Sequence, residues 1–420
     1  IIGLGYVGLP LAIEFVQAGF NVIGIDIDGN KINLINSGTN YIKDVDDKLL
    51  TKAVTANKLT ATTDFSNVQD LDSISICVPT PLNKQKDPDI SYIVSVMDKI
   101  KKHLHPNMVL TLESTTYPGS TKELILPFIK DRGFEVGKDF FLCFSPERID
   151  PGNNDYNTSN TPKVIGGITE KCTKIGASIY ETIINKVITV SSTETAEMVK
   201  LLENTFRAIN IGLANEVAIM CEKLGVNVWE VIDAAATKPF GYMKFAPGPG
   251  LGGHCIPIDP HYLSWKLKTL DYEARFIQLA GEINTNMPNH ILKLISSNLN
   301  KLHKSLNGSK ILIIGVAYKK DIDDTRESPA LDIIQLLVNA EAKIDYHDTY
   351  VPKLVYNDIS IDSIINLKSE NLNRYDACVI VTNHSNIDYD MIYNNSQLII
   401  DTRNVFYDKN GDHIKRLGQG

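Results

Sequence analysis

The sequence predicts an α/β protein in which two Rossmann-like doubly wound α/β domains are joined by a central helical domain with a long helix. Three observations predict this fold class. The chain opens on a glycine-rich strand–turn–helix–strand pattern, a proline-free helical stretch follows at residues 193–225, and a second strand–helix–strand pattern begins near residue 310. The expected domains are residues 1–192, 193–304 and 305–420.

Composition limits the classes of function. The chain has 420 residues, 43% hydrophobic and 22% charged, which is enough for two or three cores. Its 42 basic and 50 acidic residues show no excess of positive charge for a nucleic-acid partner. Six cysteines without a CxxC pair favour neither a disulfide framework nor a structural metal site. Without a membrane-length apolar run or a signal peptide, we expect a cytoplasmic protein that has no membrane partner and binds no metal.

The first expected element is the pattern IIGLGYVGLPLAIEFVQAGFNVIGIDID at residues 1–28. Only two residues precede the first glycine, whereas a strand needs about five, so we expect the start of this strand to be missing from the sequence. Asp26 ends the second strand, 18 residues after Gly8, where a carboxylate binds the adenosine ribose and repels a 2′-phosphate. The pattern therefore predicts NAD as the cofactor. The predicted pyrophosphate turn is Gly3, Gly5, Tyr6, Val7 and Gly8.

Hydroxyl side chains end the next two apolar strands, expected at residues 73–81 and 108–119. In a doubly wound sheet the ligand lies beyond the carboxyl ends of the strands, so Thr80, Ser114 and Thr115 are candidates for cofactor or substrate contact. Serine and threonine are also common in any strand-ending turn, and each alone carries little weight.

A further apolar run at residues 140–153 ends in a charged pair. Glu147 and Arg148 lie in the sequence SPER, directly after the run FFLCF. The pair has two interpretations. It forms either a surface turn or a catalytic acid beside an anion contact.

The long helix expected at residues 193–225 places Lys200 and Asn204 four positions apart, on one face. From spacing alone, a solvated face is the favoured interpretation. The apolar residues of AINIGLANEVAIM cover more of the helix than one buried side requires, which predicts a two-fold dimer built on this helix.

One cysteine follows a glycine-rich loop in GPGLGGHCIPIDPHY, residues 248–262. Most cysteines are small buried apolar residues. The preceding glycines, however, remove side chains from the approach to Cys255, which suits close contact with a ligand. A metal site made of Cys255, Asp259 and the neighbouring His254 and His261 is an alternative, but no HxH or CxxC spacing supports it.

The remaining pattern is helical at about residues 273–304 and then returns to α/β. The expected strands are KILIIGVAY (310–318), YDACVIVTN and QLIIDTRN, and a second βαβ unit starts at the first of them.

The ordered motifs resemble those of the UDP-sugar 6-dehydrogenases, which act on UDP-glucose, UDP-N-acetylglucosamine or UDP-N-acetylmannosamine. The motifs are GLGYVGLP, CVPTP, ESTTYPG, SPER, EMVKLLENTFRA, LGGHCIPID and GVAYKKDIDDTRESP, and they span nearly the whole chain. The resemblance is greatest to the UDP-N-acetylhexosamine branch, with the glucosamine enzyme first, because His254 stands where the glucose enzymes usually have serine.

The resemblance implies a function for most of these residues. The family oxidises the sugar C6 alcohol to a carboxylate with two NAD molecules and a thioester on the loop cysteine, for surface polysaccharide precursors. The implied catalytic residues are Cys255 as nucleophile, Lys200 and Asn204 at the developing alkoxide, Asp259 with Lys200 at the hydrolytic water, and Thr115 and Glu147 in water orientation and proton transfer. The other implied contacts are Pro79, Thr80, Ser114, Thr115 and Arg326 for the cofactor, and Glu147, Arg148, Lys200, Asn204, Tyr242, Gly252, Gly253 and Lys319 for the UDP-sugar.

Two positions depart from the glucose-type pattern. Pro151 stands where that branch has a second acid, so we expect a different set of proton-transfer groups. Arg148 replaces an apolar residue of that branch, and it either contacts the substrate or closes a surface salt bridge. A non-catalytic sensor of NAD and UDP-sugar is a further alternative, which the presence of Cys255, Lys200 and Asn204 disfavours.

Overall fold

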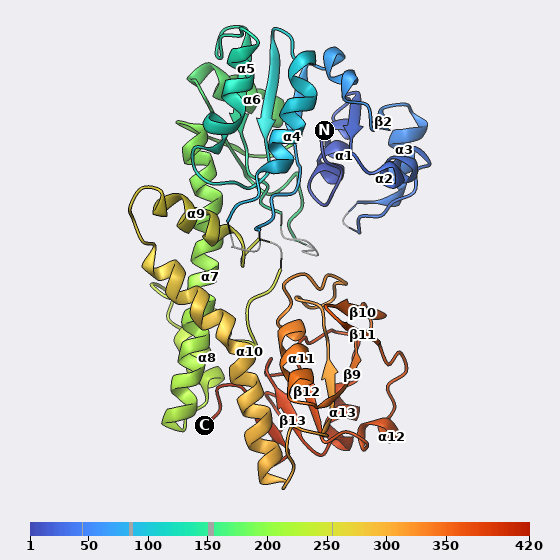
Figure 1. The fold of residues 1–420 in the computed structure, drawn as a ribbon, viewed down its shortest axis with the longest axis vertical. Coiled ribbons are helices and arrows are strands. Elements are labelled where there is room, and N and C mark those ends of the chain that lie inside the picture. Colours follow the sequence, from blue (N-terminus) through green and yellow to red (C-terminus); the bar gives the residue numbers. More distant parts are fainter. Residues whose placement is uncertain (44, 84–86, 150–154, 254) are drawn as a thin grey trace. The chain divides into compact units, whose positions relative to one another are not determined.

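The computed structural model describes residues 1–420 except 44, 84–86, 150–154 and 254 (Figure 1). The chain divides into two compact units. The first comprises residues 1–203 and 261–273, and the second comprises residues 204–260 and 274–420. Each unit is described by itself. The division of the sequence into three domains stays a prediction.

The first unit is built on one mostly parallel sheet. Five strands pair in the order β3-β4-β5-β6-β7, and only the β5–β6 pair is antiparallel. The parallel pair β1–β2 continues this sheet, because Ile2 bridges both Ile25 of β1 and Ile76 of β3. The strands are β1 (Val22–Ile25), β2 (Leu59–Thr62), β3 (Ser73–Ile76), β4 (Met108–Leu112), β5 (Phe140–Phe144), β6 (Lys163–Gly167) and β7 (Val187–Val190).

Helices cover both faces of this sheet, as expected for a doubly wound fold. β4 and β5 are buried along their whole length, which explains their continuous apolar runs MVLTL and FFLCF. One core packs α1, α2, α3 and α6 against the sheet, and the other packs α4 and α5. The helices are α1 (Gly8–Gln17), α2 (Gly29–Asn36), α3 (Asp47–Thr55), α4 (Ser91–Ile100), α5 (Leu126–Asp131) and α6 (Glu170–Tyr180), with short turns η1 (Phe65–Asp70), η2 (Lys101–His103) and η3 (Thr121–Ile125).

The predicted strands 73–81 and 108–119 end earlier than expected, at Ile76 and Leu112. The residues beyond these ends leave the ladder and form the turns at the carboxyl edge of the sheet. The strands therefore stop where the candidate polar residues begin.

The helical segment agrees with the prediction. The long helix α7 (Thr193–Leu224) ends before Gly225, whose φ of +72° lies in the left-handed region that commonly terminates helices. It is followed by α8 (Val228–Ala236), α9 (Asp259–Lys268) and α10 (Arg275–Lys301). In the part of the chain that the structure describes, no helix is both long and apolar enough to cross a membrane.

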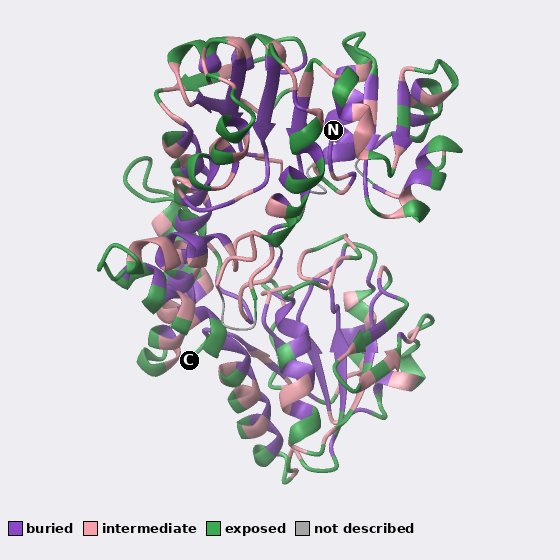
Figure 2. Cartoon of the chain, turned by 45° about the horizontal axis from the view of Figure 1, so that its top comes forward, coloured by how far each residue is buried: buried purple, intermediate pink, exposed green. Residues whose placement is uncertain are grey.

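The second unit contains a fully parallel five-stranded sheet in the order β14-β13-β12-β8-β9. A core of apolar side chains joins α10 and α11 to one face, and a second core with α12 and α13 lies on the other. The central strands of this sheet are buried, whereas the edge strand β9 and the outer helix faces are partly exposed (Figure 2). The elements are β8 (Lys310–Ile314), α11 (Pro329–Asn339), β9 (Lys343–His347), the hairpin β10 (Lys353–Tyr356) and β11 (Ile359–Asp362), α12 (Ser369–Leu372), β12 (Ala377–Ile380), α13 (Tyr389–Asn395), β13 (Ile399–Asp401) and β14 (Ile414–Arg416).

Both predicted Rossmann-like sheets and the long helix are present, so the predicted fold class is confirmed.

Candidate active site and cofactor site

The glycine turn before α1 has two kinds of glycine. Gly3 has a φ of +92°, and a Cβ atom on Gly8 would lie 1.8 Å from the Gly3 carbonyl oxygen, so packing within the chain requires both. Gly5 differs, because a Cβ atom there would meet no atom within 4 Å. Protein packing does not explain Gly5, whereas close approach of a ligand does.

The start of α1 fits the pyrophosphate of a dinucleotide. Its N-cap residue, Val7, makes no side-chain capping bond, so no side chain of Val7 occupies the first amides of the helix. These amides and the positive end of the helix dipole suit an anion. Tyr6, in the same turn, is about half exposed.

Asp26 lies directly after β1, where the ribose carboxylate was predicted. Its Oδ2 accepts a hydrogen bond from the Leu4 amide at 2.8 Å, and its Oδ1 accepts one from the Asp28 amide at 3.0 Å. Lys31 Nζ lies 3.5 Å from Oδ2. The carboxylate is thus fixed beside the glycine turn, as NAD binding requires.

The hydroxyl residues at the next strand ends already have partners within the first unit. Ser114 Oγ donates to the Val78 carbonyl at 2.7 Å, and the Thr80 carbonyl accepts from the Tyr262 hydroxyl at 2.7 Å. Pro79 and Thr115 lie in the same two turns; Pro79 is exposed and Thr115 is half-buried. These contacts hold the carboxyl ends of β3 and β4 in place.

The SPER turn holds Glu147 by its own backbone. Glu147 Oε1 accepts from the amides of Arg148 at 2.7 Å and Ile149 at 2.9 Å, and its Oε2 lies 3.6 Å from Lys163 Nζ. The Arg148 guanidinium forms an ion pair with Glu203, with an Nη2–Oε1 distance of 2.5 Å and an Nε–Oε2 distance of 3.2 Å. Of the two interpretations of Arg148, this structure shows the ion pair.

A buried charged cluster behind Glu147 was missed by the sequence analysis. Lys163 Nζ lies 2.6 Å from Glu113 Oε2, and the Tyr180 hydroxyl donates to Glu113 Oε1. Burial alone would lower the pKa of Lys163, but the carboxylates of Glu113 and Glu147 raise it. The lysine therefore stays charged between two acids. A lysine opening the buried strand KVIGG was the signal that could have revealed it.

A second missed residue is Glu197, on α7 one turn before Lys200. Its carboxylate accepts four hydrogen bonds from the turn that follows β4: from the amides of Gly119 at 2.6 Å and Thr121 at 2.9 Å, and from the hydroxyls of Ser120 at 2.9 Å and Thr121 at 2.7 Å. Glu197 thereby fixes the helix turn carrying Lys200, which is itself buried, to the segment that follows Thr115.

In the second unit, three of the predicted catalytic residues lie together. Asn204 Nδ2 donates to Asp259 Oδ2 at 2.5 Å, and the Asp259 amide donates to the Cys255 carbonyl at 2.8 Å. The bond between Asn204 and Asp259 joins α7 to the start of α9. All six cysteines lie in the described residues, and only Cys255 is not buried.

Packing within the chain gives the glycines before Cys255 a second role, beside the predicted ligand contact. A Cβ atom on Gly252 would lie 2.8 Å from both the Glu327 carbonyl oxygen and the Tyr318 Cβ, and one on Gly253 would lie 2.8 Å from the Tyr318 ring. The chain's own segment 318–329 fills the space next to this loop. The Gly253 amide also donates to the Arg326 carbonyl at 3.2 Å.

The other predicted ligand contacts lie on exposed or half-buried segments. The Arg326 guanidinium pairs with Asp324 at 2.6 Å, Lys319 is half-buried, and Tyr242 is exposed. The predictions that concern His254 and Pro151 fall outside the described residues. Among the residues described, no group of three or more His, Cys, Asp or Glu side chains is arranged to hold a metal ion.

Comparison with known proteins decides the family. Residues 1–184 match the NAD-binding domain of the UDP-glucose/GDP-mannose dehydrogenase family, residues 194–286 match its central domain, and residues 312–408 match its UDP-binding domain. The chain belongs to the UDP-glucose/GDP-mannose dehydrogenase family. It is therefore an NAD-dependent UDP-sugar dehydrogenase, and the prediction of NAD as cofactor is confirmed.

Several relatives within this dehydrogenase family match over most of the chain. A UDP-N-acetyl-D-mannosamine dehydrogenase of Methanococcus maripaludis is 34% identical, over 100% of this chain and 96% of its own. A UDP-N-acetyl-D-glucosamine 6-dehydrogenase of Pseudomonas aeruginosa is also 34% identical, over 84% of this chain and 82% of its own. The solved UDP-D-ManNAc dehydrogenase of Pyrococcus horikoshii has a TM-score of 0.91 and 32% identity, over 100% of this chain and 99% of its own.

Proposed function

We propose that this enzyme oxidises the C6 hydroxyl of a UDP-N-acetylhexosamine to a carboxylate, through a thiohemiacetal and a thioester on Cys255. The observation that carries the proposal is the placement of Cys255, whose carbonyl accepts the amide of Asp259 while the carboxylate of Asp259 accepts from Asn204. A nucleophile, an amide donor and an acid thus belong to one hydrogen-bonded group of residues.

The proposed reaction removes four electrons in two steps. The glycine turn would hold NAD, which would supply the hydride acceptor for each step. The first oxidation converts the alcohol to an aldehyde, with loss of one proton. The Cys255 thiolate then adds to the aldehyde carbon, and oxidation of the thiohemiacetal gives a thioester. Water cleaves the thioester to the carboxylate and returns the thiol, so two NAD are reduced for each sugar.

The polar residues have separate roles in these steps. An amide nitrogen has two hydrogens, so Asn204 donates one to Asp259 and has a second for the developing alkoxide. Lys200 supplies positive charge to the same oxygen. Asp259 acts with Lys200 on the hydrolytic water, while Thr115 and Glu147 orient water and transfer protons.

The proposed cofactor contacts are Gly3, Gly5, Tyr6, Val7, Gly8, Asp26, Pro79, Thr80, Ser114, Thr115 and Arg326. The proposed sugar-nucleotide contacts are Glu147, Arg148, Lys200, Asn204, Tyr242, Gly252, Gly253 and Lys319.

The relatives support an N-acetylated sugar. The names of the Methanococcus and Pyrococcus proteins specify N-acetylmannosamine, and that of the Pseudomonas protein specifies N-acetylglucosamine. The sequence analysis put UDP-N-acetylglucosamine first. That preference stays a prediction, and UDP-N-acetylmannosamine is the competing substrate. We assign the preference for an N-acetyl group to the region of Arg148 and His254.

A panel of UDP-sugars tests this assignment. NADH formation is measured with the N-acetylated gluco, manno and galacto substrates and with UDP-glucose. We expect kcat/KM to be highest for one of the N-acetylated sugars. A value for UDP-glucose equal to or above that for every N-acetylated sugar would contradict the proposal.

We also propose that the enzyme is a homodimer built on α7. Large apolar side chains recur along this helix at spacings of four and seven residues and remain exposed: Met198, Leu202, Phe206, Leu213, Met220 and Leu224. Such a stripe is typical of a helix that packs against a second helix. Light scattering at micromolar concentration should give twice the chain mass, and a monomer would refute the dimer.

A further inference from the structure

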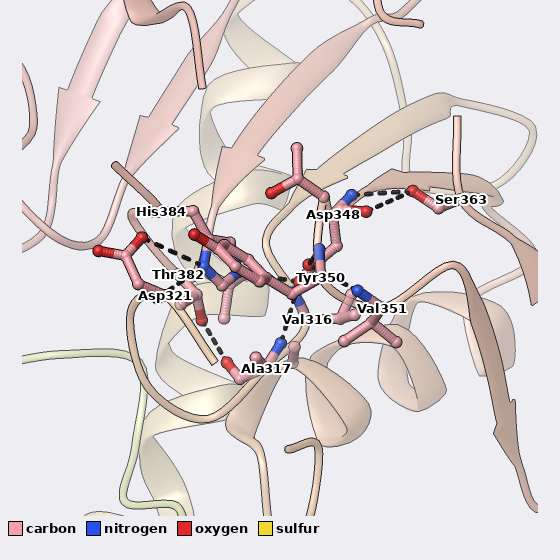
Figure 3. A network of polar contacts seen from close by, with 12 residues as sticks. Val316, Ala317, Asp321, Asp348, Tyr350, Val351, Ser363, Thr382 and His384 are labelled. Carbon is pink, nitrogen blue, oxygen red and sulfur yellow. Dashed lines mark hydrogen bonds and ion pairs between the residues drawn. The ribbon is translucent and has the colours of Figure 1, made fainter. Parts of the chain in front are cut away.

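The sheet of the second unit holds a buried polar network that the proposed reaction does not use (Figure 3). Asp348 follows β9 and is 2% exposed, and His384 lies beyond the end of β12 and is 0% exposed. Asp348 Oδ2 accepts from the amides of Val316 at 2.7 Å and Ala317 at 3.2 Å, and it lies 3.0 Å from His384 Nε2. Its Oδ1 accepts two amides of the turn after β9.

The contacts of His384 define its tautomer. The Asp321 amide lies 2.9 Å from His384 Nδ1, and a backbone amide can only donate. Nδ1 therefore carries no proton, and the proton of the neutral ring is on Nε2, which donates it to Asp348. The imidazole thus connects the amide of residue 321 to the carboxylate that holds residues 316 and 317. Both ends of the segment 316–321 depend on this ring.

The turn after β12 holds the same segment at further points. Asp321 has a left-handed φ of +63°, and its carboxylate accepts from the Ser385 amide and from the Ser385 hydroxyl, both at 2.6 Å. The Thr382 hydroxyl donates to the Ala317 carbonyl at 2.5 Å. The segment is therefore fixed in a conformation that it would not adopt as a free loop.

The position of this segment links it to ligand binding. It begins at the carboxyl end of β8, and ligands of parallel α/β sheets bind beyond the carboxyl ends of the strands. It carries Lys319, and the adjoining Tyr318 ring packs against Gly253, two residues before Cys255. The segment also lies within residues 312–408, which match a UDP-binding domain.

We propose that His384 is a positioning residue for substrate binding: by joining Asp348 to the Asp321 amide, it holds the segment 316–321 in the conformation that presents Lys319 to the diphosphate of the UDP-sugar. This inference rests on the proposed function, because it assigns the UDP group to this segment. His384 itself is buried and does not touch the substrate.

The test uses the full-length enzyme with His384→Ala and His384→Gln. UDP binding is measured by calorimetry, and KM is measured separately for the UDP-sugar and for NAD. We expect His384→Ala to raise the Kd of UDP and the KM of the UDP-sugar by about tenfold, with the KM of NAD changed by less than about twofold. Glutamine has an acceptor oxygen and a donor nitrogen, and neutral imidazole likewise has one acceptor and one donor nitrogen, so His384→Gln should recover most of the affinity.

His347→Ala is the matched control. His347 is also buried at the end of β9, but its Nδ1 contacts the Ile364 carbonyl and not the segment 316–321. It should leave the Kd of UDP unchanged. Equal losses of UDP affinity in both alanine variants, or equal losses of UDP and NAD affinity in His384→Ala, would overturn the positioning role. A wild-type enzyme that does not bind UDP would instead refute the proposed function.

Discussion

The sheets of the two units place an acid at the same topological position but surround it with different numbers of protein donors. In the first unit, Asp26 follows β1 and accepts the Leu4 amide, while the neighbouring Gly5 has open space beside it. In the second unit, Asp348 follows β9, and five protein donors occupy its two oxygens. The first glycine of each turn is crowded in both sheets, because a Cβ atom on Gly3 would lie 2.7 Å from the Cys77 carbonyl oxygen and one on Gly315 would lie 2.2 Å from the Thr382 carbonyl oxygen.

We infer that this difference adapts the same architecture to two ligands, the dinucleotide cofactor and the sugar nucleotide. The first sheet keeps its glycine turn open for a dinucleotide. In the second sheet, protein donors occupy both oxygens of the equivalent acid, and we propose that a longer segment, residues 315–328, contacts the ligand. Because the two ligand sites depend on different residues, variants should affect them separately.

The largest difference between an effect on turnover and an effect on ligand binding is expected for Cys255→Ser in the second unit. Serine keeps the shape of the side chain but is a poor nucleophile and leaving group at neutral pH. We expect the rate of uronate formation to fall by about a thousandfold or more, while the Kd values of NAD and UDP stay near those of the wild type. A variant that retained most of its uronate-forming rate would return Cys255 to a structural role.

Gly5→Val tests the open turn of the first unit. A Cβ atom at this position meets no protein atom within 4 Å, so the melting temperature should stay close to that of the wild type, while the KM of NAD rises by about tenfold or more. The paired variant Gly8→Ala would place its Cβ against the Gly3 carbonyl and should lower stability by about 1–3 kcal/mol. If Gly5→Val left the KM of NAD unchanged, the turn would not be the pyrophosphate site.

Asp26→Asn addresses the choice between NAD and NADP. The wild type should prefer NAD clearly, because the carboxylate accepts the ribose hydroxyls and repels a 2′-phosphate. Loss of the charge should raise the KM of NAD by about tenfold and increase the ratio of NADP to NAD activity. Comparable kcat/KM for the two cofactors in the wild-type enzyme would remove this role from Asp26.

The smallest effect concerns the acid stability of the second unit. Burial alone would raise the pKa of Asp348, but hydrogen bonds from His384 and backbone amides hold it below its ordinary value of 3.8. A lowered pKa means that the carboxylate stabilises the fold above about pH 4 and that this stability is lost as the pH falls through the folded-state pKa. Asp348→Asn should therefore lower the free energy of unfolding by about 1–3 kcal/mol at pH 7. The difference in unfolding free energy between this variant and the wild type should become smaller below pH 4.

The fluorescence of Trp229, which lies in the second unit, provides the measurement when Trp265 is replaced by phenylalanine. Denaturant unfolding is followed at pH 7 and at pH 3.5. If the difference in unfolding free energy between wild type and Asp348→Asn increased at the lower pH, the assigned direction of the pKa shift would be contradicted.

The features that could be predicted from the sequence are those determined by residues that lie close together along the chain. The glycine turn, Asp26 and the long helix α7 follow from local spacing, and the structure contains all three. The strand ends were less accurate, since an apolar pattern continues past the last ladder bond, as it does beyond Ile76.

The missed features depend on contacts that only the fold creates. Glu113 and Lys163 are 50 residues apart, and Asp348 and His384 are 36 apart, so no spacing rule links them. The glycines before Cys255 were noted, but their packing role within the chain was not. Their space is filled by Tyr318 and other residues far along the chain.

The stoichiometry of the reaction tests the central claim most directly. NADH and sugar product are counted in a single reaction with a limiting amount of the preferred UDP-N-acetylhexosamine. The thioester route through Cys255 predicts two NADH for each uronate and no free aldehyde in solution. One NADH for each sugar, with release of the aldehyde, would contradict the account.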